Sequence, residues 1–416
     1  TVARSTTLPP EDMWFAGEAV QYYYGGQMLT ALLATLTDTA PRFAYNLALA
    51  GFYATLVTAA YGLAGAIAAD HGAPRRFAAV VAAFFVGIAG NLDTAVRVAA
   101  WALPSEALAT LPGVGPEHEL GSWTPAAFSY WDSSRIVEGT INEFPLFAWL
   151  NGDLHAHMMG TPFLLLSAAL AYAYYRTPEA DLARRRTLAF VAVPVVAGLQ
   201  VVVDTWSAPS VLGLLWLAVA LRPADPLTLC PGREMTRLFA ALGLAPADLR
   251  GRGPTTLRAE AVRPIAALGA VGVAALLAVV LAAPFLLGAA AGRELVLVPP
   301  GMRSGTGELV LVHGAFLAAF TAYLAARLRP RPRDVVWVAV ALVVLAWVAL
   351  GVSAPVLVLV VPLLVAAWLA ARLDWPVGFE AVLVVAGAGL LTLVEVVYVR
   401  EQAGPGRLNT VFKTYM

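Results

Sequence analysis

Several stretches of this sequence run for more than sixteen residues without a charged side chain. Runs of this length constrain the fold, because a helix needs about 20 apolar residues to cross the hydrocarbon core of a bilayer. Apolar residues make up 60% of the chain and charged residues 13%, which lies outside the usual range of soluble globular proteins. We therefore predict an all-α integral membrane protein that lies in the cell membrane as a multi-pass chain.

The apolar runs predict about ten transmembrane helices, with residues 25–36 too short to be a further span. We expect residues 25–36 to form an amphipathic helix on the outer membrane surface. The runs at 188–221 and 335–371 each contain a Ser/Pro break, so each is either two short spans or a re-entrant hairpin. The expected spans are 43–69, 77–101, 158–175, 188–203, 208–221, 264–288, 309–326, 335–352, 354–371 and 376–398.

Arginine residues predict the orientation of these spans, because they collect in cytoplasmic loops. They gather in the connections 70–76, 176–187, 222–263 and 327–334. The chain is then organised as an extracytoplasmic loop at 1–42, a polytopic domain at 43–398 and an extracytoplasmic segment at 399–416. Within the polytopic domain, 102–157 forms a second extracytoplasmic loop and 222–263 a cytoplasmic loop. The first residue is not methionine and the chain ends just after a polar run, so we expect a fragment of a longer protein.

Charge and cysteine content exclude some classes of function. The formal net charge is zero, so nothing indicates binding to nucleic acid. A single cysteine excludes an internal disulfide and a cluster of thiolate metal ligands. Most of the acids, histidines and aromatic motifs fall instead on the predicted outer side of the membrane, which indicates an extracytoplasmic active face.

The motif GDLHAH contains Asp153, His155 and His157 directly before an apolar run. In an extended segment all three side chains share one face, and in a helix Asp153 and His157 share one face at i, i+4. Either arrangement offers oxygen and nitrogen ligands to a divalent metal such as zinc, manganese or magnesium, or contacts a substrate directly. The alternative is a hydrogen-bonded helix terminus, or histidines solvated at the interface.

Two adjacent acids, Glu11 and Asp12, follow a Pro-Pro pair in the motif PPEDMWFAGE. An acid on an outer loop could deprotonate a hydroxyl acceptor, which is the work of a general base. The alternative is an N-cap, because aspartate often precedes a helix.

Further candidates for substrate binding lie in three other motifs. Tyr22, Tyr23 and Tyr24 could stack on sugar rings or hold a lipid phosphate, or they could form an interfacial aromatic belt. Asp132 and Arg135 form either a local ion pair or part of a phosphate clamp. The last set is Arg407, Asn409 and Lys413. Its cations lie on the outer side, against the positive-inside bias, and so indicate an anionic ligand. Glu143 is a further candidate and lies in the same outer loop as Asp132.

These motifs resemble those of a family of uncharacterised polytopic membrane proteins of archaea and Chloroflexi that is named for a YYY signature. The resemblance spans nearly the whole chain, because PPEDMWFAGE…YYYGG, NLD, WDSSR, TINEFP, GDLHAH and RLNTVFK occur in that order. Position 25 departs from the pattern, since it is glycine where a bulky residue is expected. The family proteins are also longer at both ends. The resemblance implies no activity.

The arrangement of loops is also similar to that of the GT-C class of lipid-dependent glycosyltransferases. This similarity implies that Asp12 or Glu11 is the catalytic base and that Arg407 or Lys413 holds a polyprenyl phosphate. We therefore expect a GT-C-like membrane glycosyltransferase with a polyprenyl-phosphate-linked sugar donor and a sugar or protein acceptor. The alternatives are a membrane transporter, which would carry ionisable residues at mid-membrane and inverted repeats, and a non-catalytic subunit or scaffold.

Overall fold

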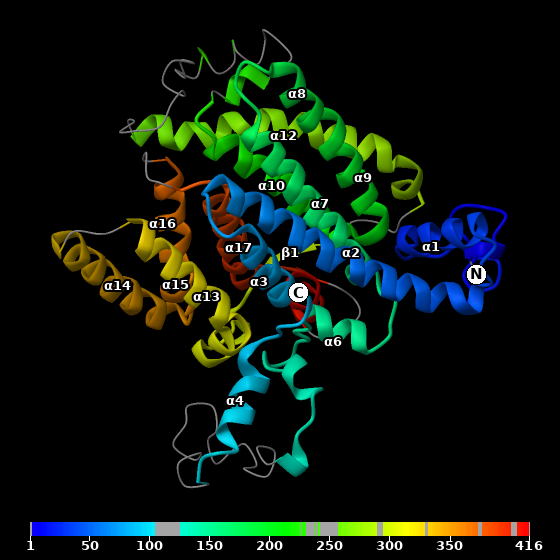
Figure 1. Ribbon diagram of the computed structural model, residues 1–416, viewed down its shortest axis with the longest axis horizontal. Helices are drawn as coiled ribbons and strands as arrows, with labels where there is room; N and C mark the ends of the chain where they lie inside the picture. Colours follow the sequence, from blue (N-terminus) through cyan, green and yellow to red (C-terminus); the bar gives the residue numbers. More distant parts are fainter. Residues whose placement is uncertain are drawn as a thin grey trace. The chain divides into compact units, whose positions relative to one another are not determined.

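The computed structural model describes residues 2–104, 125–224, 226–229, 237, 240–241, 257–288, 294–328, 332–372, 377–400 and 406–415. The chain divides into two compact units. Unit 1 comprises Thr1–Gly87, Trp149–Gly292 and Trp368–Ala386, and unit 2 comprises Ile88–Ala148, Arg293–Ala367 and Gly387–Met416. The described residues are mostly helical (Figure 1). Much of the predicted loop 222–263 and residues 105–124 of the predicted loop 102–157 lie outside the described residues.

Unit 1 is a bundle of apolar helices in which α9 packs on α7 and α12, α10 packs on the same two helices, and α2 packs on α3 and α7. The short helix α1 packs against α2 and α9. Pro41 begins α2, where its missing amide hydrogen costs nothing because the first helical amides have no partner. The helices are α1 Gly25–Leu36, α2 Pro41–Asp70, α3 Arg75–Gly87, α7 Ala156–Arg176, α8 Leu182–Thr187, α9 Val193–Asp204, α10 Ala208–Leu221 and α12 Leu257–Leu286.

The run from Leu182 to Leu221 folds back on itself. As one straight helix it would be about 60 Å long, yet both of its ends lie at Tyr174. Arg185 near the start of the run donates to the Tyr174 hydroxyl at 2.9 Å, and Arg222 just after its end donates to the Tyr174 carbonyl at 3.0 Å. The turn is the short 3-10 helix Thr205–Ser207, where the extended backbone of Asp204 ends α9. The Ser/Pro break at residues 204–210 therefore makes a hairpin.

Unit 2 contains helices and one two-stranded sheet. Strand β1 (Glu294–Leu297) pairs antiparallel with β2 (Val397–Arg400). A buried apolar cluster formed by Leu309, Leu317, Val356, Val360 and their neighbours holds the helices together. The helices that lie wholly in unit 2 are α4 Leu92–Ala100, α13 Thr306–Leu328, α14 Pro332–Val352, α15 Val356–Leu359 and α18 Leu408–Thr414, while α6 Pro145–Leu150, α16 Val361–Arg372 and α17 Phe379–Val396 pass from one unit to the other.

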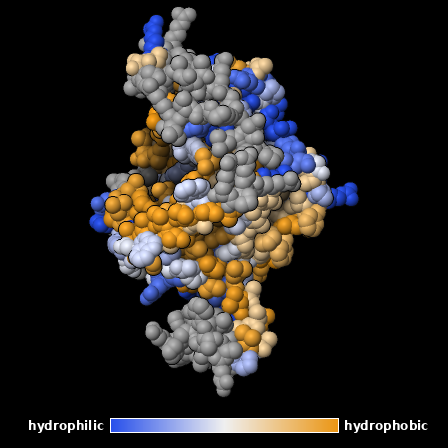
Figure 2. Space-filling view, turned by 90° about the vertical axis from the view of Figure 1, so that its left-hand side faces the viewer, coloured by the Kyte–Doolittle hydropathy of each residue, from blue (hydrophilic) through white to orange (hydrophobic). Residues whose placement is uncertain are grey.

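By length and composition, seven helical runs in the described part of the chain could cross a membrane, and the folded run Leu182–Leu221 is one of them. In α14 only 6% of the most apolar window is buried inside the structure, so almost all of this surface needs lipid around it. Hydrophobic residues also cover much of the face shown in Figure 2. The prediction of an all-α membrane protein is confirmed, and helix α1 has the predicted bounds. That α1 lies on the membrane surface stays a prediction.

Two of the ten expected spans are interrupted, which is a correction to the prediction. The expected span 77–101 breaks at residues 88–91, because the side chain of Asn91 accepts the amide hydrogen of Asp93 and starts a new helix, α4. The expected span 354–371 divides at Val360 into α15 and α16. Pro362 lacks the amide hydrogen that would continue the helix across this point.

Glycine at position 25 allows α1 to approach α9 closely. A Cβ atom there would lie 2.9 Å from the backbone carbon and oxygen of Val202. We expect Gly25→Ala to destabilise the protein by about 1–3 kcal/mol, because backbone atoms must move. Gly51→Ala is the matched control, since its Cβ would meet nothing within 4 Å, and it should be neutral or stabilising by about 0.5–1 kcal/mol. Thermal unfolding in detergent measures both, and equal midpoints would contradict the close approach.

Candidate functional site

The segment before α7 presents Asp153 and His155 on one side of an extended backbone. Leu154 between them points the other way and is only 5% exposed. Gly152 precedes them with a φ of +69°, a left-handed conformation that favours glycine. Helix α7 then starts at Ala156, and the side chain of His155, its N-cap residue, makes no capping hydrogen bond. The imidazole of His155 is therefore available for other contacts.

His155 connects an acid to a phenol. Its Nδ1 lies 3.1 Å from Oδ2 of Asp153, and its Nε2 lies 2.9 Å from the Tyr22 hydroxyl. In the neutral imidazole beside an ionised carboxylate, which only accepts hydrogen bonds, Nδ1 carries the proton and Nε2 is the acceptor. The Tyr22 hydroxyl accordingly donates to Nε2. We call Tyr22, Asp153 and His155 the His155 site; it lies entirely within unit 1.

The His155 site is open to solvent on one side and buried on the other. Tyr22 is 45% exposed, whereas His157 is 3% exposed with its ring 4.6 Å from that of His155. The segment is thus extended up to His155 and helical from Ala156, which combines the two conformations considered from the sequence. His157 points into the protein and away from the exposed side of the His155 site.

Metal binding by Asp153, His155 and His157 is not supported by the arrangement of the described residues. No group of three His, Cys, Asp or Glu side chains among them could hold a metal ion. Both ring nitrogens of His155 already face a partner, Asp153 or Tyr22. A divalent ion at Asp153, His155 and His157 stays a prediction.

Two residues that the sequence did not single out hold the segment in place. The Tyr45 hydroxyl, from α2, donates to the carbonyl of Gly152 at 3.0 Å and accepts the amide hydrogen of Leu154 at 2.8 Å. The amide group of Gln27, from α1, lies 3.4 Å from the carbonyl of Leu154. Nothing in the local sequence around Tyr45 or Gln27 indicates these contacts, because each spans more than a hundred residues.

The three consecutive tyrosines have different environments. Only Tyr22 reaches His155, while Tyr23 and Tyr24 are 8% and 7% exposed. The ring of Tyr24 packs on Phe285 with centroids 5.6 Å apart, and burial raises the pKa of its phenol. A substrate can therefore reach the Tyr22 ring directly, whereas Tyr23 and Tyr24 contribute packing at the start of α1.

Glu11 and Asp12 belong to a hairpin-like turn. The Asp12 amide donates to the carbonyl of Glu18 at 2.8 Å, and the Asp12 carboxylate accepts the amide hydrogen of Trp14 at 2.7 Å. The Glu11 carboxylate accepts the amide hydrogen of Gly17 at 2.9 Å. These contacts stabilise the turn, although no helix follows as an N-cap would require. A role for either acid as a general base stays a prediction.

The sequence matches, over residues 1–416, the family described as Uncharacterized membrane protein (DUF2298). The chain belongs to the DUF2298 family. No curated protein and no solved structure matches it. Membership of DUF2298 agrees with the predicted resemblance and with a multi-pass membrane protein, and it assigns no activity.

In unit 2 of this DUF2298 protein, Arg407 is buried and bonded to an acid. Arg407 donates to Glu395 at 2.6 Å and to the Ser304 hydroxyl at 2.7 Å. The Glu395 carboxylate also accepts hydrogen bonds from the Ser304 amide at 2.8 Å and from the Tyr415 hydroxyl at 2.5 Å. Arg407 and Glu395 are 2% and 1% exposed. This network ties the segment at the start of α18 to the end of α17, and an anionic ligand would have to replace Glu395.

The other candidate phosphate-binding residues in unit 2, Asn409 and Lys413, also have partners within the protein. Lys413 lies over the ring of Phe412 at 4.8 Å, and Asn409 on the same helix, α18, is partly buried. Phosphate binding by Arg407, Asn409 and Lys413 stays a prediction.

Asp132 does not form the expected local ion pair with Arg135. Asp132 lies 3.6 Å from Arg97, while Arg135 stacks on the ring of Trp131 at 4.5 Å. Burial lowers the pKa of the Arg135 guanidinium, and the carboxylate of Glu143 partly offsets this effect. Asp132, Arg135 and Glu143 lie in unit 2. Within unit 1 the structure brings the candidate residues Tyr22, Asp153, His155 and His157 together, and Tyr23 packs on Tyr22.

Proposed function

We propose that this protein is a glycosyltransferase that moves a sugar from a polyprenyl-phosphate carrier to a hydroxyl acceptor on the extracytoplasmic face of the membrane. The observation that carries the proposal is the hydrogen-bonded chain from Asp153 through His155 to the Tyr22 hydroxyl. Membership of a membrane protein family and the apolar helices around the His155 site support a lipid-linked substrate.

The hydrogen bonds between Asp153 and His155 and between His155 and Tyr22 run in the direction that a general base requires. Asp153 holds the proton on Nδ1 and orients the ring, so that Nε2 presents its lone pair to a hydroxyl group. Tyr22 occupies that position in the structure, at 2.9 Å. An acceptor hydroxyl that takes the place of the Tyr22 hydroxyl would meet the same lone pair at hydrogen-bond distance.

The reaction is a displacement at the anomeric carbon of the donor sugar. The acceptor hydroxyl gives its proton to Nε2 of His155, and its oxygen forms a bond to the anomeric carbon. The bond between that carbon and the phosphate oxygen breaks, and the polyprenyl phosphate leaves with the electron pair. His155 is then protonated, and Asp153 stabilises the imidazolium because the two groups are in contact.

A direct assay tests this function. Purified full-length protein in bicelles is incubated with a panel of radiolabelled polyprenyl-phosphate sugars and with saccharide or peptide acceptors. We expect transfer of label from at least one donor into a water-soluble product and release of polyprenyl phosphate. Absence of transfer across a broad donor panel would contradict the proposal and favour a transporter or a scaffold.

A further inference from the structure

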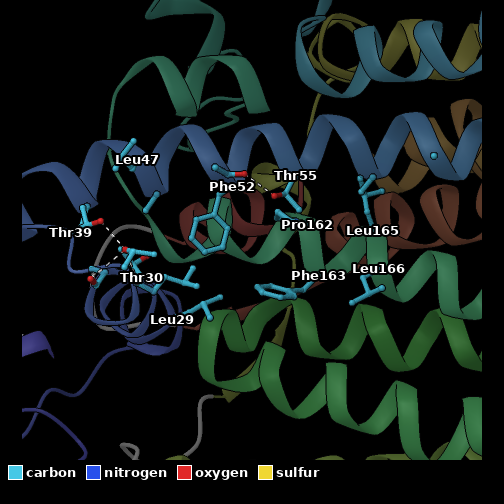
Figure 3. Close-up of a pocket in the computed structure, with 18 of the residues that line it drawn as sticks. Leu29, Thr30, Thr39, Leu47, Phe52, Thr55, Pro162, Phe163, Leu165 and Leu166 are labelled. Carbon is cyan, nitrogen blue, oxygen red and sulfur yellow. Dashed lines mark hydrogen bonds between the residues drawn. The ribbon is translucent and has the colours of Figure 1, made fainter.

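An apolar groove runs between α1, α2 and α7, with a cavity volume of about 790 Å³. Figure 3 shows Phe52 of α2 and Phe163 of α7 in the space between their helices, with Leu29 and Thr30 of α1 beside them. None of the residues that line the groove is charged. The groove lies entirely within unit 1.

The hydroxyl groups along the groove already have hydrogen-bond partners within the protein. Thr30 donates to the carbonyl of Gly26 at 3.0 Å, and Thr55 donates to the carbonyl of Gly51 at 2.7 Å. Groups that are satisfied in this way do not require a polar ligand. The groove therefore suits a hydrocarbon.

The groove has the length and direction of a lipid chain. Its lining along α2 extends from Ala44 to Leu63, which is about 28 Å of helix. The hydrocarbon core of a bilayer is about 30 Å thick. Helices α2 and α7 run in the same direction: Tyr45 bonds the segment before α7, and Tyr172 near the end of α7 bonds Asp70 at 2.7 Å. Both are candidate spans, so the groove follows the path of a chain across the membrane.

Two glycines on α2 widen the groove. A Cβ atom at Gly51 or at Gly62 would meet nothing within 4 Å, although both residues line the groove. Glycine within a helix costs about 0.5–1 kcal/mol relative to alanine. The absence of side chains at Gly51 and Gly62 therefore leaves open space in the groove.

One end of the groove reaches the segment that carries Asp153 and His155. The side chain of Leu154, which lies between Asp153 and His155, packs in a cluster with Ala48, Phe52 and Phe163. These three cluster members also line the groove. A lipid chain that fills the groove from this end therefore ends at the segment that carries Asp153 and His155, on the side that Leu154 faces.

We propose that the groove between α1, α2 and α7 binds the polyisoprenoid chain of the donor lipid, with the phosphate end of that lipid at the His155 site. This inference rests on the proposed function, which supplies the chemistry of the head group. The groove itself supplies the length, the apolar walls and the connection to the site. Ordinary phospholipid chains lack the phosphosugar head group that would hold them at this end.

Filling the groove with a larger side chain tests the inference. Gly51→Leu and Gly62→Leu each place a side chain in open space, and leucine favours the helix more than glycine does. Gly272→Leu is the matched control, because Gly272 lies on α12, has no atom within 4 Å of an added Cβ and does not line the groove. All three variants should unfold no more readily than the native protein.

Binding is measured without turnover. A photoreactive polyprenyl phosphate that carries no sugar is bound to the full chain in nanodiscs, and its dissociation constant is obtained by competition. We expect Gly51→Leu and Gly62→Leu to bind it roughly ten- to hundredfold more weakly, because added methyl groups exclude the chain. Gly272→Leu should match the native protein. Mass spectrometry of the cross-linked protein should place the label on the peptides that contain Phe52 or Phe163.

The outcomes separate the groove from the reaction. Unchanged binding in both groove variants would overturn the inference, even if the protein transfers sugar. Competition by a dialkyl phosphate that equals competition by polyprenyl phosphate would overturn the assignment to an isoprenoid chain. Binding that depends on Gly51 together with no transfer from any donor would leave the groove assignment standing and overturn the proposed function.

Discussion

Replacing His155 by glutamine should lower the rate of sugar transfer by about 10²- to 10⁴-fold, which is the usual contribution of a positioned general base. Glutamine can keep hydrogen bonds to Asp153 and Tyr22, but it does not accept a proton at neutral pH. The His155 side chain is 28% exposed, so we expect little change in stability. Initial rates with a radiolabelled donor, compared at saturating donor, measure the effect on kcat.

Asp12→Asn is the matched comparison for this experiment. The amide oxygen of asparagine can still accept the Trp14 amide hydrogen that Asp12 accepts in the structure, so the turn should persist. Where His155 rather than Asp12 is the base, Asp12→Asn should retain most of its activity. Full activity in His155→Gln with loss of activity in Asp12→Asn would move the role of base to Asp12. Recovery of His155→Gln by added manganese or zinc would instead identify His155 as a metal ligand.

Replacing Arg407 by leucine should lower the free energy of unfolding by about 3–5 kcal/mol, as expected when one partner of a buried ion pair is removed. The Glu395 carboxylate would keep its hydrogen bonds from Ser304 and Tyr415, but it would remain buried without a positive charge. Thermal or denaturant unfolding of the purified protein in detergent measures the change.

Arg400→Leu serves as the control for Arg407→Leu. Arg400 pairs with Glu294 across β1 and β2 at 2.9 Å, yet these side chains are 58% and 65% exposed. An exposed ion pair contributes at most about 1 kcal/mol. Equal stability of the two variants would contradict the structural role of Arg407. A raised KM for the donor with unchanged stability would support its predicted role as a phosphate ligand instead.

The helices could be predicted from the sequence where local composition determines them. Helix α1 has the expected bounds because two glycines precede its apolar residues and Pro41 starts the next helix. The break at 88–91 was missed because apolar residues continue up to Gly90. The signal was present in Asn91, which belongs to the NLD motif and caps α4.

The candidate site could be predicted only in part, for a similar reason. Asp153 and His155 lie two residues apart, so their proximity follows from the motif itself. The partner of His155 on the other side, Tyr22, lies 133 residues away in sequence. Its contact depends on the packing of α1 against α7, which no local pattern encodes. The sequence identifies Arg407 as a cation on the predicted outer side of the membrane. Its buried partner, Glu395, comes before strand β2 in the chain, whereas Arg407 follows that strand.

The two hydrogen bonds of Tyr45 have a consequence for thermodynamic coupling. Its hydroxyl holds Gly152 and Leu154 in place beside His155, and its helix, α2, forms one wall of the groove. A change in that wall is therefore transmitted to the segment that orients the imidazole. A double-mutant cycle of Tyr45→Phe and Gly51→Leu should show a coupling energy of about 0.5–3 kcal/mol in the free energy of unfolding. Substitutions in the groove that change the preferred length of the lipid chain would then change the turnover rate as well.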